Sequence, residues 1–109
     1  MSTMKEKWTS AKPLIYQQIA DEIQRSAMYE PNNHVTWHTV RDRVNLLVSP
    51  LIPLGYLDEC KVFCDETNNT KDTIEANEFH VDFAWKLDDS TEFTIVSFVI
   101  SPKGMAIKQ

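Results

Sequence analysis

The first third of the chain has apolar residues at the three- to four-residue spacing of an amphipathic helix. These positions are Leu14, Ile15, Ile19, Ile23 and Ala27. Pro13 is favoured in the first turn of a helix, so we expect the helix to begin near it, with Ser10 as a possible cap. It should end near Tyr29, because the residue before Pro31 is driven out of the helical region.

A second helical pattern follows the turn that contains Asn32 and Asn33. Asn33 is a favourable N-cap residue. The apolar positions of this helix are Val35, Trp37, Val40, Val44, Leu47 and Val48. Pro50 and Pro53 should end or kink it, and Gly55 can supply the positive φ of a stop before the first strand.

The second half of the chain changes to the period of two that is typical of β-strands. A first strand is expected around residues 60–64, a second over 79–87 with large apolar residues at every odd position, and a third over 92–101. We therefore predict an α+β fold, in which two amphipathic helices pack on a small, mainly antiparallel three-stranded sheet. The third strand is apolar on both faces, so it either lies at the centre of the sheet or is covered by a neighbouring subunit.

Composition and charge limit the function classes. The 109 residues suit one domain, and the 42% hydrophobic and 25% charged content is that of an ordinary globular chain. A net charge of −5 disfavours nucleic acid, which needs clustered Lys and Arg. The apolar runs are too short to span a membrane, and no secretory signal follows Lys5 and Lys7. We expect neither nucleic acid nor membrane as a partner.

Cys60 and Cys64 cannot bridge each other if both lie on one strand. Their Cα atoms would then be about 13 Å apart, whereas a disulfide needs them within about 7 Å. The spacing is also a weak zinc signal, since no second ligand pair accompanies it. Two readings stay open: half-buried thiols that act as small apolar side chains, or an intermolecular disulfide formed after release from the reducing cell.

Enzyme and metal-site interpretations find little support in the sequence. His34 and His38 have a spacing that can hold a metal, but the residues between them lack the glutamate of a metalloprotease. Cys64 and His80 could be considered as a nucleophile and its base. The acidic residues after Cys64 argue against this, because they should raise the pKa of the thiol and so disfavour the reactive thiolate. We expect no catalytic residue, no metal and no cofactor.

Four segments together resemble the C-terminal domain of the contractile-tail sheath proteins of bacteriophages. They are Tyr29-Glu30-Pro31-Asn32-Asn33, residues 40–45, the run from Cys60 to Thr70 (CKVFCDETNNT) and residues 92–96. The resemblance covers roughly Pro13 to Ser101, in matching order and spacing. It implies a structural virion protein of a phage tail, present in the host cytoplasm during assembly and without enzymatic activity.

The resemblance also implies how subunits would join. Sheath C-terminal domains exchange terminal arms, and the small sheet of each domain accepts strands from its neighbours, which is strand augmentation. We therefore divide the chain into an N-terminal arm (1–12), a sheath C-terminal-like domain (13–101) and a C-terminal tail (102–109). The expected subunit-interface residues are Trp8, Val96, Phe98, Ile100, Met105 and Ile107. Two alternatives stay open: Trp8 packs back on the first helix, and the tail is disordered.

The expected position of the subunit in the tail rests on one difference between this sequence and the sheath proteins that it resembles. Sheath proteins carry large domains ahead of this module that the sequence does not encode, which favours a specialised subunit at the end of the sheath. We expect it at the neck or collar, with a baseplate sheath initiator or a bulk sheath component as alternatives. The implied partners are the tail sheath protein, copies of this chain in a ring of roughly six or twelve, and neck or baseplate proteins.

Overall fold

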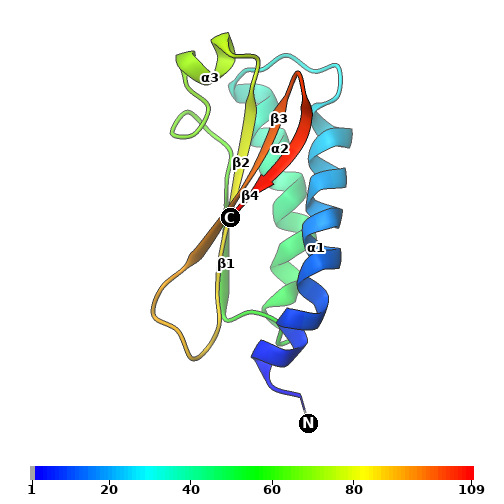
Figure 1. Ribbon diagram of the computed structural model, residues 1–109, viewed down its shortest axis with the longest axis vertical. Coiled ribbons are helices and arrows are strands. Elements are labelled where there is room, and N and C mark those ends of the chain that lie inside the picture. The colour runs from blue at the N-terminus through cyan, green and yellow to red at the C-terminus, as the bar shows by residue number, and fades with distance from the viewer. Residues whose placement is uncertain (1) are drawn as a thin grey trace.

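Two long antiparallel helices lie side by side on one face of a four-stranded antiparallel sheet (Figure 1). The computed structural model describes residues 2–109. In chain order the elements are α1 (Met4–Ala27), α2 (His34–Val48), the 3-10 turn η1 (Ser49–Leu51), β1 (Glu59–Phe63), α3 (Lys71–Glu75), β2 (Phe79–Lys86), β3 (Thr94–Ser101) and β4 (Gly104–Lys108). The predicted α+β class is confirmed, but the sheet has a fourth strand that the sequence interpretation did not assign.

The first helix begins at Met4, and the start expected near Pro13 is wrong. Thr3 and Glu6 form a reciprocal capping box, in which the Glu6 N–H donates to Thr3 Oγ1 at 3.1 Å and the Thr3 N–H donates to Glu6 Oε1 at 3.0 Å. Pro13 lies inside the helix. The segment expected to be an arm is therefore helical from Met4, and it packs on the domain through Trp8.

The second helix begins as predicted. The side chain of Asn33 accepts hydrogen bonds from the main-chain N–H groups of Val35 and Thr36, at 3.1 and 3.3 Å. After Val48 the chain turns through η1, and Gly55 has the expected positive φ, at 83°.

The strand order is β1-β2-β3-β4, and each pair is antiparallel. β3 is therefore an internal strand, which explains its apolar residues on both faces: Phe98 is buried towards the helices and Val99 on the opposite face. β4 follows a two-residue turn, pairs Met105 with Ile100 and Ile107 with Phe98, and occupies most of the segment expected to be a tail.

The core lies between the helices and the sheet face that they cover. Its largest fully buried side chains are Trp8, Phe83, Phe98, Ile19, Ile23, Leu57, Val40, Val44, Val48, Val81 and Val96. They come from both helices and the two central strands, with Leu57 from the segment before β1, so the sheet's inner face has little apolar surface left over. The sheet edges, in contrast, have main-chain groups that the sheet itself does not pair.

Candidate assembly surface

The sheet is open and has two free edges, which differ in their protection. β1 exposes two charged side chains, Glu59 and Lys61, within its five residues. β4 has one charged side chain, that of Lys108 at its end, and none from Gly104 to Ile107. Charged residues on an edge strand discourage pairing with other chains. Of the two edges, β4 is therefore the one better suited to accept a further strand.

An apolar groove lies beside the β4 edge, where the end of α1 passes the end of β3. It encloses about 460 Å³ and is lined by Gln24, Ala27, Met28, Tyr29 and Ile100. Met28 is 55% exposed and Tyr29 is 97% exposed. Tyr29 also has a φ of 62°, in the left-handed region that bulky residues rarely adopt. Large apolar side chains thus face solvent where α1 ends, near Ile100 of β3.

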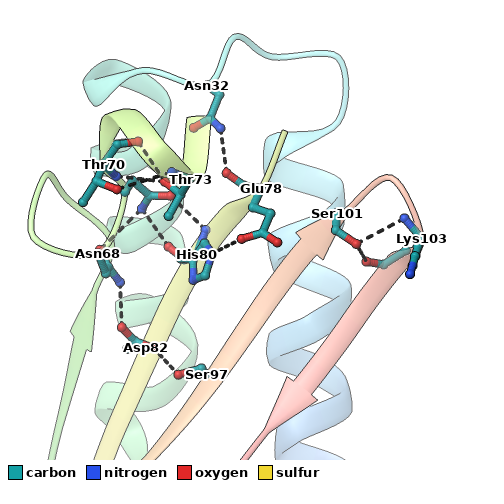
Figure 2. A network of polar contacts seen from close by, with 12 residues as sticks. Asn32, Asn68, Thr70, Thr73, Glu78, His80, Asp82, Ser97, Ser101 and Lys103 are labelled. Carbon is teal, nitrogen blue, oxygen red and sulfur yellow. Dashed lines mark hydrogen bonds and ion pairs between the residues drawn. The ribbon is translucent and has the colours of Figure 1, made fainter. Parts of the chain in front are cut away.

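A polar network fixes the turn that carries Tyr29. Asn32 accepts a hydrogen bond from the Trp37 indole N–H at 2.7 Å and donates to the Glu78 carbonyl at 2.8 Å, which joins the turn to α2 and to the start of β2. Figure 2 shows Asn32 above Glu78, at the end of the sheet that also bears α3. The carboxylate of Glu78 in turn contacts the His80 ring at 2.9 Å.

The Asn-rich run after β1 belongs to the same network. The Asn68 amide donates to the Phe63 carbonyl and to Asp82 Oδ2, both at 2.9 Å, and Asp82 also accepts from the Ser97 hydroxyl (Figure 2). Thr67 donates to Asp65, and this hydrogen bond lowers the pKa of Asp65. The run is thus a structural turn, in which the side chains of Asp65, Asn68 and Asn69 are hydrogen-bonded within the chain.

The opposite end of the domain holds an aromatic cluster. The Trp8 ring meets the rings of Trp85 and Tyr16 edge-on, with centroids 5.2 and 6.3 Å away. The Trp85 indole N–H donates to the Tyr16 hydroxyl at 2.9 Å. The neighbouring Lys7 ammonium donates to the Leu54 carbonyl at 2.7 Å, which ties the first turns of α1 to the loop after η1.

The expected interface residues fall into two groups. Trp8, Val96 and Phe98 are at most 1% exposed and belong to the core of this chain, so in this conformation they have no surface to offer a neighbour. Ile100 and Met105 are partly buried beside that core, and Ile107 is 40% exposed. The structure therefore brings the last three together on β3 and β4, with Met105 and Ile107 on the edge strand.

The sequence interpretation missed Met28 and Tyr29. The sequence does contain an indication of them: two large apolar residues stand directly after the end of the first helix and before Glu-Pro. Turns at such places normally carry polar side chains, so apolar ones suggest a contact surface.

Both cysteines are free thiols in this chain. Cys64 is fully buried, and burial, reinforced by the charge of Asp65, raises its pKa to about 12. Burial also raises the pKa of the half-buried Cys60. Neither thiol is activated as a nucleophile, because nucleophilic cysteines have lowered pKa values. For an intermolecular disulfide, Cys60 is the better placed of the two, since some of its surface is accessible.

Two further observations concern chemistry and membranes. His34 and His38 stack edge-on along α2, with ring centroids 6.2 Å apart. Within residues 2–109, no group of three or more His, Cys, Asp or Glu side chains could hold a metal ion. Across the same residues, none of the helices has the length and apolar character needed to cross a membrane.

These features define a small α+β structural module with an open antiparallel sheet and an apolar groove where α1 ends. The family model of the phage tail sheath C-terminal domain matches residues 10–101, and this chain belongs to that family. It is accordingly a structural protein of the phage tail sheath, it assembles with sheath proteins, and it is located in the virion tail. Neither the curated proteins nor the solved structures contain a match to it.

Proposed function

We propose that this chain is a sheath-like subunit that joins the end of the sheath to the neck or collar, and that it links to its neighbours through added β-strands. Membership of the sheath family over residues 10–101 is the observation that carries the proposal. Sheath domains must remain connected while the tail contracts, and strand addition meets that need because main-chain hydrogen bonds tolerate many sequences.

The edge of β4 supports a role as strand acceptor. Main-chain groups along an edge strand lack partners within the sheet, and here no charged side chain guards the stretch from Gly104 to Ile107. Met105 and Ile107 on β4 provide apolar side chains against which those of the incoming strand can pack. Such side-chain contacts supply the register and specificity that main-chain hydrogen bonds cannot.

A sequence detail favours the neck over the baseplate. A Glu-Pro-Arg type motif is expected of baseplate sheath initiators, whereas here Glu30-Pro31 is followed by Asn32. The side chain of Asn32 bridges Trp37 and Glu78 inside the domain. The longer, charged side chain of arginine could not reproduce both hydrogen bonds, because it has no acceptor for the Trp37 indole N–H.

The experiment is a cryo-electron microscopy reconstruction of the phage particle that contains this chain. Density for the domain in one ring between the last sheath layer and the neck is the expected result. Density next to the baseplate would assign it to the sheath initiator, and density in every layer would assign it to the bulk sheath. Either of these results overturns the neck proposal while leaving the family assignment intact.

A matched pair of variants tests the link itself. Ile107→Lys places a charge on the β4 edge, and Ile95→Lys places the same charge on an exposed position of β3 near the other end of the sheet. If β4 accepts a strand, Ile107→Lys should prevent incorporation into tails and Ile95→Lys should not. Normal incorporation of the Ile107→Lys protein would contradict strand addition at this edge.

A further inference from the structure

We propose that the free protein forms a symmetric dimer in which β4 pairs antiparallel with β4 of a second copy, about a two-fold axis at Ala106. The two sheets would thereby join into one continuous sheet. This inference concerns the isolated protein in solution, so it does not depend on the position of the subunit in the tail.

The hairpin geometry determines which main-chain groups of β4 are available. Ser101 and Gly104 are paired across the two-residue turn between β3 and β4. Residues that close such a turn exchange hydrogen bonds, and the pattern then alternates along the strand. Ala106 therefore directs its N–H and C=O towards Val99 on β3, while Met105 and Ile107 direct theirs to the free edge.

These outward groups select a self-complementary register. Antiparallel pairing about Ala106 places Met105 of each copy opposite Ile107 of the other, so that their outward N–H and C=O groups face one another. Gly104 lies opposite Lys108, and Ala106 opposite Ala106. Every residue of β4 then has a partner, and each pair lies on the same face of the sheet.

Neighbouring registers fit less well. Pairing about Met105 would place the charged Lys103 opposite Ile107 in the row that faces the helices, which leaves a charge beside an apolar partner. Pairing about Ile107 would leave Gly104 and Met105 without partners in the opposing β4 and would place Ala106 opposite Lys108. The register about Ala106 is thus preferred by both hydrogen bonding and side-chain pairing.

The incoming strand would also extend an apolar row of the sheet. Across the inner face of the sheet, Phe79, Ile100 and Met105 form one row of paired residues. The partner's Ile107 would be the next member of this row, next to Met105. Ile107, which is 40% exposed in the single chain, would be covered in both copies.

The β1 edge would not pair in this way. Glu59 and Lys61 are exposed on it, and the polar turn after Phe63 follows directly. These side chains discourage a second strand from approaching, whereas β4 has no equivalent between Gly104 and Ile107. The proposal therefore predicts a dimer and not an open chain of subunits, since only one edge is used.

Cysteine trapping tests the register directly. Ala106 residues facing each other would form a non-hydrogen-bonded pair with Cα atoms about 4.5 Å apart, within disulfide range. The full-length Ala106→Cys protein should form a covalent dimer under mild oxidation, seen on a non-reducing gel. Lys61→Cys, which places an exposed thiol on the other edge, and the unmodified protein with its native Cys60 and Cys64 are the controls. Equal dimer yield from the Lys61→Cys protein would overturn the proposal.

Sedimentation velocity gives an independent measurement on the unmodified protein. We expect a monomer–dimer equilibrium that Ile107→Lys weakens by at least about tenfold, with Ile95→Lys unchanged. A protein that remains monomeric at all concentrations, or that forms larger oligomers, overturns the dimer. A monomeric protein that still occupies the neck ring in virions would refute this proposal alone, and a dimeric protein absent from the neck would refute only the proposed function.

Discussion

The side-chain amide of Asn69 pairs with the main chain of His80 in the manner of a neighbouring strand. Its Nδ2 donates to the His80 carbonyl at 2.8 Å, and its Oδ1 accepts from the His80 N–H at 2.9 Å. The last residue of β1, Phe63, pairs with Asp82, two residues further along β2. Asn69 therefore continues the hydrogen bonding of β2 beyond the point where β1 ends. The Asn-rich run that resembles sheath proteins thus has a structural role.

Replacing Asn69 with alanine should lower the stability of the domain substantially. Asn69 is buried, and its loss leaves the His80 N–H and C=O without their partners. We expect a decrease of about 2–3 kcal/mol in the free energy of unfolding, measured by urea denaturation. Asn45→Ala, at an exposed position of α2, is the matched control and should change this free energy by less than about 0.5 kcal/mol. Equal effects would contradict a specific role for the amide.

Replacing Trp8 with alanine tests whether this residue stabilises the core of its own chain or anchors it to a neighbouring subunit. Trp8 is fully buried against Tyr16 and Trp85, so its truncation should decrease the free energy of unfolding by about 3–5 kcal/mol. Leu14→Ala on the exposed side of α1 should have little effect on stability. If the Trp8→Ala protein unfolds at the same urea concentration as the unmodified protein but fails to enter tails, residues 1–12 act as an arm after all.

The helices and the first three strands could be predicted because their periodicity is long and regular. The start of α1 was missed because Pro13 is a strong signal for a first turn, although the Thr3-to-Glu6 capping box indicated the earlier start. β4 was missed because Pro102 and Gly104 disfavour a strand locally. The tight turn that they permit lets the next residues pair with β3, a contact that only the tertiary structure reveals.

The interface residues were predicted only in part, for a related reason. An apolar strand looks the same in sequence whether its cover comes from the chain itself or from a neighbour. Val96 and Phe98 are covered by α1, α2 and the adjoining strands of their own chain, while Ile107 lies on the edge strand. Strand order, which is a long-range property, distinguishes the two cases.

The thiol of Cys64 should react only when the domain unfolds. At pH 8 we expect slow modification by iodoacetamide in buffer and rapid modification in urea, because burial holds its pKa at about 12. Single variants Cys60→Ala and Cys64→Ala allow the two thiols to be followed separately by mass spectrometry. Rapid alkylation of Cys64 in the native protein would show that the turn after β1 opens readily.

The raised pKa of Cys64 also predicts a loss of stability in alkali. Because the folded-state value lies above the unfolded value of about 8.5, the contribution of this thiol is fully present below that pH. It is lost as the pH rises towards 12. The free energy of unfolding should therefore fall more steeply above pH 9 for the unmodified protein than for Cys64→Ala, as measured by urea denaturation. Parallel pH profiles would contradict burial of the thiol.

Phe98 and Ile107 face each other across β3 and β4, yet their replacement should have different consequences for assembly. Phe98→Ala leaves a cavity in the core and should decrease the free energy of unfolding by about 3–5 kcal/mol. We expect this variant to be absent from tails because it does not remain folded. Ile107→Ser alters an exposed edge side chain and should leave circular dichroism and urea denaturation almost unchanged while it weakens binding to purified sheath protein. Unchanged sheath binding by folded Ile107→Ser would exclude β4 from the contact. Loss of binding without loss of fold in Phe98→Ala would instead contradict the assignment of Phe98 to the core of its own chain, where it packs on Tyr16 of α1.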